Sequence, residues 1–263
     1  MTYLDRNIDF PRPLERTPEQ ELQELHDIYG NGSLLHSPNR IMPEHLPVDG
    51  TLTWLCDRVA QAKLEGKYTA LVAGGFDVPH DNHEWYIRDC RARVAKRILE
   101  QEGRVPTPGA IMDIMTSDRI ALIVSIDSDE ALNARKGGQA EKGGIPRPVY
   151  PWSARAQRIA GYSFEHPATG ELHHAADIVT KECAVNYTGT PLQSANHLTA
   201  YLGELDLLDS YIVFDEHPQD EINARNNGFD PIIVPQAVIY ARDPRTGDEY
   251  KSSGIIKLIR GNQ

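Results

Sequence analysis

Two almost uninterrupted apolar runs constrain the fold of this chain more than any other feature of its sequence. Residues 68–73 (YTALVA) and 119–126 (RIALIVSI) have too few polar side chains to leave one face in water, so both are predicted to be strands buried on two faces. Shorter runs follow at residues 211–214 and 231–234. Helical patterns separate the runs, and strands that alternate with helices predict an α/β fold with a doubly wound parallel sheet. Ligands bind at the carboxyl ends of the strands in such sheets.

The segments between the runs show helix and hairpin signals. An amphipathic helix is expected at residues 52–65, because Leu55, Val59 and Ala62 share one face and Gly66 can end it. Another helix is expected to begin near His80 and His83 and to continue to about residue 101. Further helices are predicted at residues 152–162, 175–184, 192–207 and 252–260, a loop with a short helix at 127–136, and hairpins at 163–173 and 238–250.

Composition excludes several classes of protein. The net charge of −11 argues against broad binding to nucleic acid or to an anionic membrane. The three cysteines, Cys56, Cys90 and Cys183, are widely spaced and form no CxxC pair, so neither a disulfide framework nor a cysteine zinc site is expected. No stretch approaches the roughly 18 apolar residues of a membrane-spanning helix. A cytoplasmic protein is therefore predicted.

The stretch at residues 71–88, LVAGGFDVPHDNHEWYIR, is the first to indicate a function. Gly74 and Gly75 follow a predicted strand and let a phosphate or nucleotide approach the backbone closely. His80 and His83 are three residues apart at a helix start, so both can face one ligand. Two alternatives are a helix cap beside a surface histidine and a zinc-binding pair, although further zinc ligands at a recognisable spacing are missing.

The segment GGFDVPHDNH resembles the GxFDxxHxGH signature of the nucleotidyltransferase superfamily that carries the HxGH motif. Asn82 stands where the family usually has glycine. Glycine there would let the nucleotide approach the helix start, whereas asparagine would crowd it or contribute a hydrogen bond. The matching positions are Gly74, Phe76, Asp77, His80 and His83.

Four later segments resemble motifs of the same family in the same order. They are VSIDSDEALNARKGG, which contains Lys136, RPVYPWSARAQRIAGY, which contains Arg147 and Arg155, YIVFDEHPQD, and YKSSGIIKLI, which contains Ser252 and Ser253. The second and third look closest to the sugar-phosphate adenylyltransferases of the heptose-phosphate type. In the last segment, Lys251 replaces a small hydroxyl residue of the family pattern.

The resemblance covers residues 68–160 and 209–260 and suggests a division of the chain. Residues 1–50, rich in proline and charge, are predicted to be an N-terminal extension that wraps over the main domain or contacts a second subunit, so a homo-oligomer is compatible with the sequence. Residues 51–263 are predicted to form the nucleotidyltransferase domain. Its insertion at about residues 163–208 is expected to shape the acceptor side of the site or an oligomer interface.

The resemblance implies a role for each motif residue. The catalytic residues would be His80, His83 and Lys136, with the histidines donating hydrogen bonds to the triphosphate. The nucleotide would be bound by Gly74, Gly75, Phe76, Asp77, Asn82, Arg155, Ser252 and Ser253. Arg147 and Trp85 would contact the acceptor, and Mg²⁺ would bridge the triphosphate.

A purely structural role is the alternative interpretation for these residues. Lys136 in its glycine-rich loop can simply be solvated, Arg155 can form a surface pair on its helix, and Asp77 can be a turn former. Ser252 and Ser253 can be an N-cap, and the tryptophans, Trp85 among them, can be packing residues.

The leading hypothesis is an enzyme that transfers AMP or CMP from ATP or CTP to a small phosphorylated acceptor, a sugar or polyol phosphate, and releases pyrophosphate. A nicotinamide- or pantetheine-type adenylyltransferase is an alternative within the same chemistry. An alternative from another class is a nucleotide-binding regulatory or assembly protein without turnover, which Asn82 and Lys251 motivate.

Overall fold

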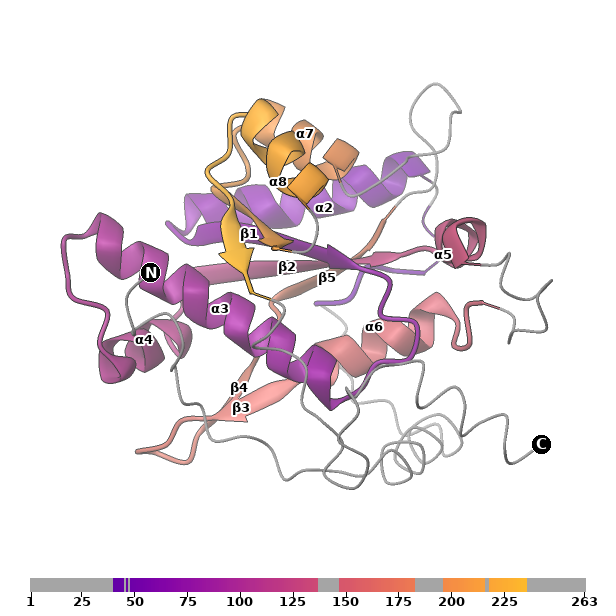
Figure 1. The fold of residues 1–263 in the computed structure, drawn as a ribbon. Coiled ribbons are helices and arrows are strands. Elements are labelled where there is room, and N and C mark those ends of the chain that lie inside the picture. Colours follow the sequence, from indigo (N-terminus) through magenta and orange to yellow (C-terminus); the bar gives the residue numbers. More distant parts are fainter. Residues whose placement is uncertain are drawn as a thin grey trace.

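A five-stranded parallel sheet forms the centre of the protein (Figure 1). The computed structural model describes residues 40–44, 46, 48–136, 147–182, 196–215 and 218–235. In chain order its strands are β1 (Tyr68–Gly74), β2 (Ile120–Asp127), β5 (Ile178–Glu182), β6 (Ser210–Phe214) and β7 (Ile232–Val234). The four apolar runs of the sequence form β1, β2, β6 and β7, as predicted, and β5 is a fifth strand that was not predicted.

The strand order across the sheet is β5-β2-β1-β6-β7. The chain begins in the middle with β1, moves outward to β2 and β5, and then returns to place β6 on the other side of β1. Every pairing within this sheet is parallel. The prediction of a doubly wound α/β sheet is therefore confirmed. Its topological switch point, where such sheets bind ligands, lies between the carboxyl ends of β1 and β6.

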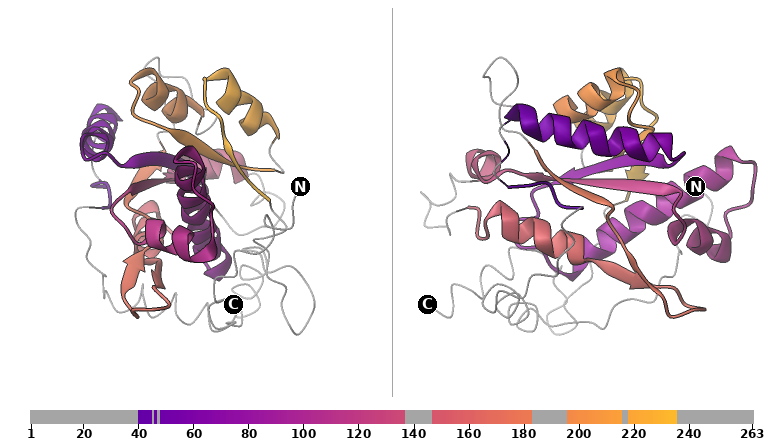
Figure 2. Two further views of the ribbon diagram at one scale, coloured as in Figure 1. Left: turned by 90° about the vertical axis from the view of Figure 1, so that its left-hand side faces the viewer. Right: turned by 180° about the vertical axis from the view of Figure 1, so that it is seen from behind.

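Helices cover both faces of the sheet (Figures 1 and 2). In both figures α2, α7 and α8 lie above the sheet, and α3, α4 and α6 lie below it, while α5 stands beside the carboxyl end of β2. The helices are α2 (Val48–Leu64), α3 (Asp81–Gln101), α4 (Pro108–Met115), α5 (Asp129–Lys136), α6 (Trp152–Gly161), α7 (Asn196–Glu204) and α8 (Pro218–Asn226).

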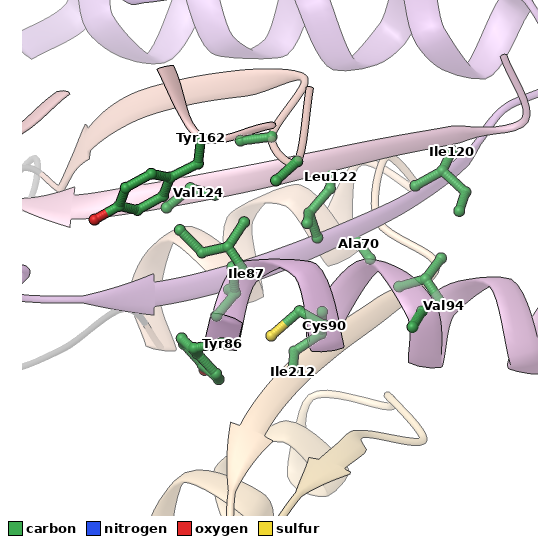
Figure 3. Close-up of a cluster of buried hydrophobic side chains, with 14 of the residues drawn as sticks. Ala70, Tyr86, Ile87, Cys90, Val94, Ile120, Leu122, Val124, Tyr162 and Ile212 are labelled. Carbon is green, nitrogen blue, oxygen red and sulfur yellow. The ribbon is translucent and has the colours of Figure 1, made fainter. Parts of the chain in front are cut away.

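Alternation along the central strands divides the core into two clusters. Leu71 and Ile123 pack with α2 and α7 on one face. Ala70 and Leu122 point to the other face, where side chains of α3 such as Cys90 meet them (Figure 3). Because β1 and β2 are buried on both sides, their sequences are mostly apolar, with Thr69, Ser125 and Asp127 as buried polar exceptions.

Two aspartates hold the amino edge of the sheet in the same way. Asp209 immediately precedes β6, and its carboxylate accepts the backbone N–H of Thr69 at 2.7 Å, while its own N–H donates to the Thr69 carbonyl. Asp177 precedes β5 and makes the same exchange with Leu122, also accepting at 2.7 Å. Each carboxylate is also paired with a cation, Lys63 for Asp209 and Arg91 for Asp177.

The helix predicted at residues 175–184 is wrong. Residues Ile178–Glu182 form β5, the edge strand beside β2, because their β-branched side chains pack in the sheet and their backbone pairs with residues 55 positions earlier. The predicted insertion at 163–208 thus contributes a strand to the central sheet. The hairpin predicted at 163–173 is confirmed by β3 (Ser163–Glu165) and β4 (Leu172–His174).

Several other segments complete the comparison with the sequence. Helices α4 and α8 were not predicted, although α4 has a clear start signal in its N-cap Thr107 followed by Pro108. The predicted hairpin at 238–250 and the predicted helix at 252–260 lie outside the described residues. In the described part of the chain, no helix has both the length and the apolar character needed to cross a membrane.

Candidate active site at the carboxyl edge of the sheet

The loop after β1 turns sharply at the switch point. Phe76 has a backbone φ of +41°, which is rare for a residue with a side chain, and its ring is buried back over the end of the strand. A Cβ atom on Gly74 would lie 2.9 Å from Cε2 of this ring, too close for a non-bonded contact. Glycine is therefore required at position 74 by the packing of Phe76.

The two histidines meet at the start of α3, as the spacing predicts. His80 is the N-cap residue, and its backbone N–H donates to Nδ1 of His83 at 3.2 Å. Their ring centroids are 4.0 Å apart, and the ring of Phe76 stands edge-on to His83 at 5.2 Å. Because Nδ1 of His83 accepts a hydrogen bond, the neutral ring of His83 carries its proton on Nε2.

His80 lies in a buried position that keeps its imidazole neutral. Only 2% of the residue is exposed, and burial, followed by the neighbouring His83 and Arg158, holds the pKa of His80 well below its usual 6.5. Its carbonyl accepts a hydrogen bond from the hydroxyl of Tyr162 at 3.1 Å, which fixes the start of the helix. Nothing in the sequence marks Tyr162 for this role, because only the fold brings it to residue 80.

Asp77 connects the loop after β1 to the segment before α6. The carboxylate is buried and accepts the N–H of Val149 at 2.7 Å and a hydrogen bond from the guanidinium of Arg147. The structure thus brings together two residues that the sequence predicted to bind nucleotide and acceptor. Asp77 positions Arg147 at the carboxyl edge, where the cation also offsets the buried negative charge.

Arg155 joins three segments at the same edge. It lies in the first turn of α6 and is fully buried. Its guanidinium donates to the carbonyls of Gly75, Asp127 and Tyr150 at 2.6, 2.8 and 3.1 Å, and to Oδ1 of Asp129 at 2.6 Å. Sequence reasoning did not identify Asp129 as a site residue.

The remaining predicted residues are placed less centrally. Asn82 is buried in the first turn of α3. Trp85 is half-buried one turn beyond the histidines, and the guanidinium of Arg88 lies 5.9 Å from its ring centroid. Lys136 is the last residue of α5, whereas Ser252 and Ser253 lie outside the described residues.

Aromatic packing closes the switch point from the side of β6. Phe214, the last residue of β6, stacks on Tyr86 of α3 with ring centroids 4.3 Å apart and an interplanar angle of 17°. This contact holds the first turns of α3 against the strand that follows β1 in the sheet order. The histidine pair therefore lies on a rigid frame made by β1, α3 and β6.

The described residues offer no protein-built metal centre. Among them, no three histidine, cysteine, aspartate or glutamate side chains are arranged to hold a metal ion. The described residues therefore do not form a metal site of their own for the magnesium ion that the resemblance implies.

Comparisons with known proteins add no family name. No protein-family model matches the chain, and no curated protein is detectably similar to it. Any assignment of function therefore depends on the histidine motif in the sequence and on its place in a doubly wound sheet.

Proposed function

We propose that the protein is a nucleotidyltransferase, which transfers AMP or CMP from ATP or CTP to a small phosphorylated acceptor and releases pyrophosphate. One observation supports this most strongly. The rings of His80 and His83 are 4.0 Å apart at the N-terminus of a 21-residue helix, directly after the central strand and beside the switch point of the sheet. A helix N-terminus at this place favours anionic ligands such as phosphates.

The geometry suits a single in-line displacement. A phosphate oxygen of the acceptor attacks the α-phosphorus of the triphosphate, the bond from that phosphorus to the bridging oxygen breaks, and pyrophosphate leaves with the bonding electron pair. His83 offers its Nε2–H to the oxygens that gain negative charge, and neutral His80 offers a single N–H. No covalent intermediate on the protein is required.

Charge on the two anionic reactants needs a compensating cation. Arg147 fits this role, because it is held by the buried carboxylate of Asp77 at the same edge of the sheet. A phosphate group of the acceptor would share the guanidinium with Asp77, which leaves the cation in place between turnovers. Magnesium, when bound to the triphosphate, would supply further charge neutralisation, with most of its ligands from phosphate and water.

The test is pyrophosphate release by the full chain in the presence of magnesium. Each of ATP and CTP is paired with a panel of sugar phosphates, polyol phosphates, nicotinamide mononucleotide and phosphopantetheine. One triphosphate and one acceptor class should give release. His80→Ala and His83→Ala should each lower kcat by about 100-fold or more, as loss of a transition-state donor does.

His173→Ala is the matched control, since His173 lies in the β3–β4 hairpin and has no role in the proposed chemistry. It should turn over like the wild type. Pyrophosphate release that survives both His80→Ala and His83→Ala would exclude the proposed role of the pair.

A second candidate is a nucleotide-binding protein without turnover. Asn82 favours it, because this side chain replaces the glycine of the motif and is only 2% exposed in the first turn of α3. If asparagine holds the bound triphosphate out of line for transfer, the wild type binds a triphosphate without releasing pyrophosphate, and Asn82→Gly gains release. If the enzyme hypothesis is right, the wild type turns over without this change.

A further inference from the structure

Arg155 is the most completely buried large side chain at the carboxyl edge. A guanidinium with no exposure to solvent is costly unless its donors are satisfied, and a single carboxylate is not enough for this. Here four donors are used, three on backbone carbonyls and one on Asp129. The side chain therefore has a specific structural task, distinct from that of a solvent-facing ligand for phosphate.

The three carbonyls belong to the segments that frame the candidate site. Gly75 is in the loop that leads from β1 to the histidines, Asp127 ends β2, and Tyr150 precedes α6 in the segment that contains Arg147. These segments are far apart in the sequence, and the bond to Gly75 alone joins residues 80 positions apart. A planar fork of donors can hold all of them in one arrangement.

We propose that Arg155 is a positioning residue for nucleotidyl transfer, and that it acts by fixing the loop after β1 relative to the end of β2 without contacting the triphosphate. This inference rests on the proposed function. Transfer requires the reacting oxygen and phosphorus to be aligned, and an error of about 1 Å in such an alignment costs on the order of 100-fold in rate. The role differs from the nucleotide contact that the resemblance implies.

Replacing Arg155 by lysine tests the geometry of the guanidinium separately from its positive charge. An ammonium group keeps the positive charge, but as a compact group on a flexible stem it cannot reach three carbonyls and a carboxylate together. Arg155→Lys should therefore preserve the charge beside Gly75 and loosen the three segments. The change isolates the positioning role.

Arg91 provides a matched control at the opposite edge of the sheet. This arginine of α3 is also buried, donates to the carbonyl of Met115 at 2.7 Å, and pairs with Asp177 at 2.6 Å. Arg91→Lys removes a comparable buried fork far from the candidate site. Both variants should lower the melting temperature, but only Arg155→Lys should lower kcat.

The experiment measures kcat and KM for the triphosphate and the melting temperature of wild type, Arg155→Lys and Arg91→Lys. Arg155→Lys should lower kcat by about 100-fold at saturating triphosphate, as misalignment does. Its KM should change little, because no direct contact is lost. Arg91→Lys should keep kcat within about threefold of wild type at a temperature where both variants are folded.

Three results would overturn the inference. The first is a wild-type kcat in Arg155→Lys, and the second is an equal loss of kcat in Arg91→Lys, which would indicate general destabilisation. The third is a raised KM with an unchanged kcat, which would make Arg155 a ligand of the triphosphate. If Arg155→Lys fails to fold, Asp129→Ala removes one partner of the fork and should lower kcat several-fold with an unchanged KM.

The failure of the proposed function is recognisable separately. If the wild type releases no pyrophosphate with any substrate pair, the proposed function is wrong and the inference falls with it. If the wild type turns over and Arg155→Lys equals it, only the inference about Arg155 is wrong.

Discussion

At the scale of single residues, burial determines what the two histidines can do. His80 is held neutral by burial and by its neighbours His83 and Arg158, so it can donate one hydrogen bond but cannot serve as a permanent positive charge. His83 takes its tautomer from the backbone N–H of His80. The spacing of three residues predicted that the rings meet. The low pKa of His80 depends on burial and on its neighbours His83 and Arg158, and only the fold determines this burial.

The lowered pKa of His80 predicts a stability difference in mild acid. Between the folded pKa and 6.5, the unfolded chain binds a proton at His80 that the folded chain does not, so stability falls as the pH is lowered through 6.5. From pH 7.5 to 5.5, wild type should therefore lose more unfolding free energy than His80→Gln. Urea unfolding at the two pH values measures this. Equal losses would show that His80 titrates normally.

The close packing of Gly74 and Phe76 predicts that substitutions at these two positions have coupled effects on stability. Gly74→Ala places a methyl group 2.9 Å from the Phe76 ring, which in turn contacts His83, so stability should fall by about 1–3 kcal/mol and kcat should fall with it. Thermal unfolding and pyrophosphate release measure both effects. Adding Phe76→Leu should restore part of the stability. A double variant less stable than Gly74→Ala would contradict this packing explanation.

At the scale of elements, the sequence predicted most of the strands and helices but not every one. The runs that became β1 and β2 are apolar at most buried positions, so their own composition identified them. Strand β5 was mistaken for a helix because it contains Lys181 and Glu182 and follows two alanines, and these residue types favour helices. Only pairing with β2, a contact distant in sequence, makes this segment a strand.

Two helical glycines predict opposite effects of the same substitution. A Cβ on Gly109 in α4 meets nothing within 4 Å, so Gly109→Ala should raise the unfolding free energy by about 0.4–1 kcal/mol through the unfolded state. A Cβ on Gly203 in α7 would lie 2.6 Å from the ring of Phe229, so Gly203→Ala should lower the unfolding free energy by about 1–2 kcal/mol. Chemical denaturation measures both. Changes of the same sign would contradict the assigned packing of α7.

At the scale of the whole molecule, the two edges of the sheet have different tasks. The amino edge is held by Asp177 and Asp209, each of which exchanges hydrogen bonds with the backbone of a neighbouring strand. The carboxyl edge contains the histidine pair and the segments joined by Arg155. The motifs pointed to His80, His83, Asp77, Arg147 and Arg155 at the second edge, but not to Asp129 or Tyr162. The sequence could not predict how Arg155 is used, because its partners are mostly backbone carbonyls, which no residue pattern reveals.

This division predicts that the amino edge can be weakened without loss of catalysis. Asp177→Asn and Asp209→Asn each remove the negative charge of a carboxylate that accepts a backbone N–H and pairs with a cation. Each substitution should therefore lower the unfolding free energy by about 1–3 kcal/mol. The double variant should show the sum, since three strand spacings of roughly 5 Å each separate the sites. Unfolding curves and KM values measure this. A change in KM would show that the two edges are coupled.

The return of the chain to β1 has a consequence for synthesis on the ribosome. Strand β1 is translated before β6, and Asp209, whose carboxylate accepts the N–H of Thr69 in β1, follows Thr69 by 140 residues. Until β6 is made, the edge of β1 that pairs with it is open, and an open strand edge pairs readily with strands of other molecules. A pause in translation ahead of β6 therefore exposes the nascent protein to aggregation, and this is the interval in which chaperones have most to protect.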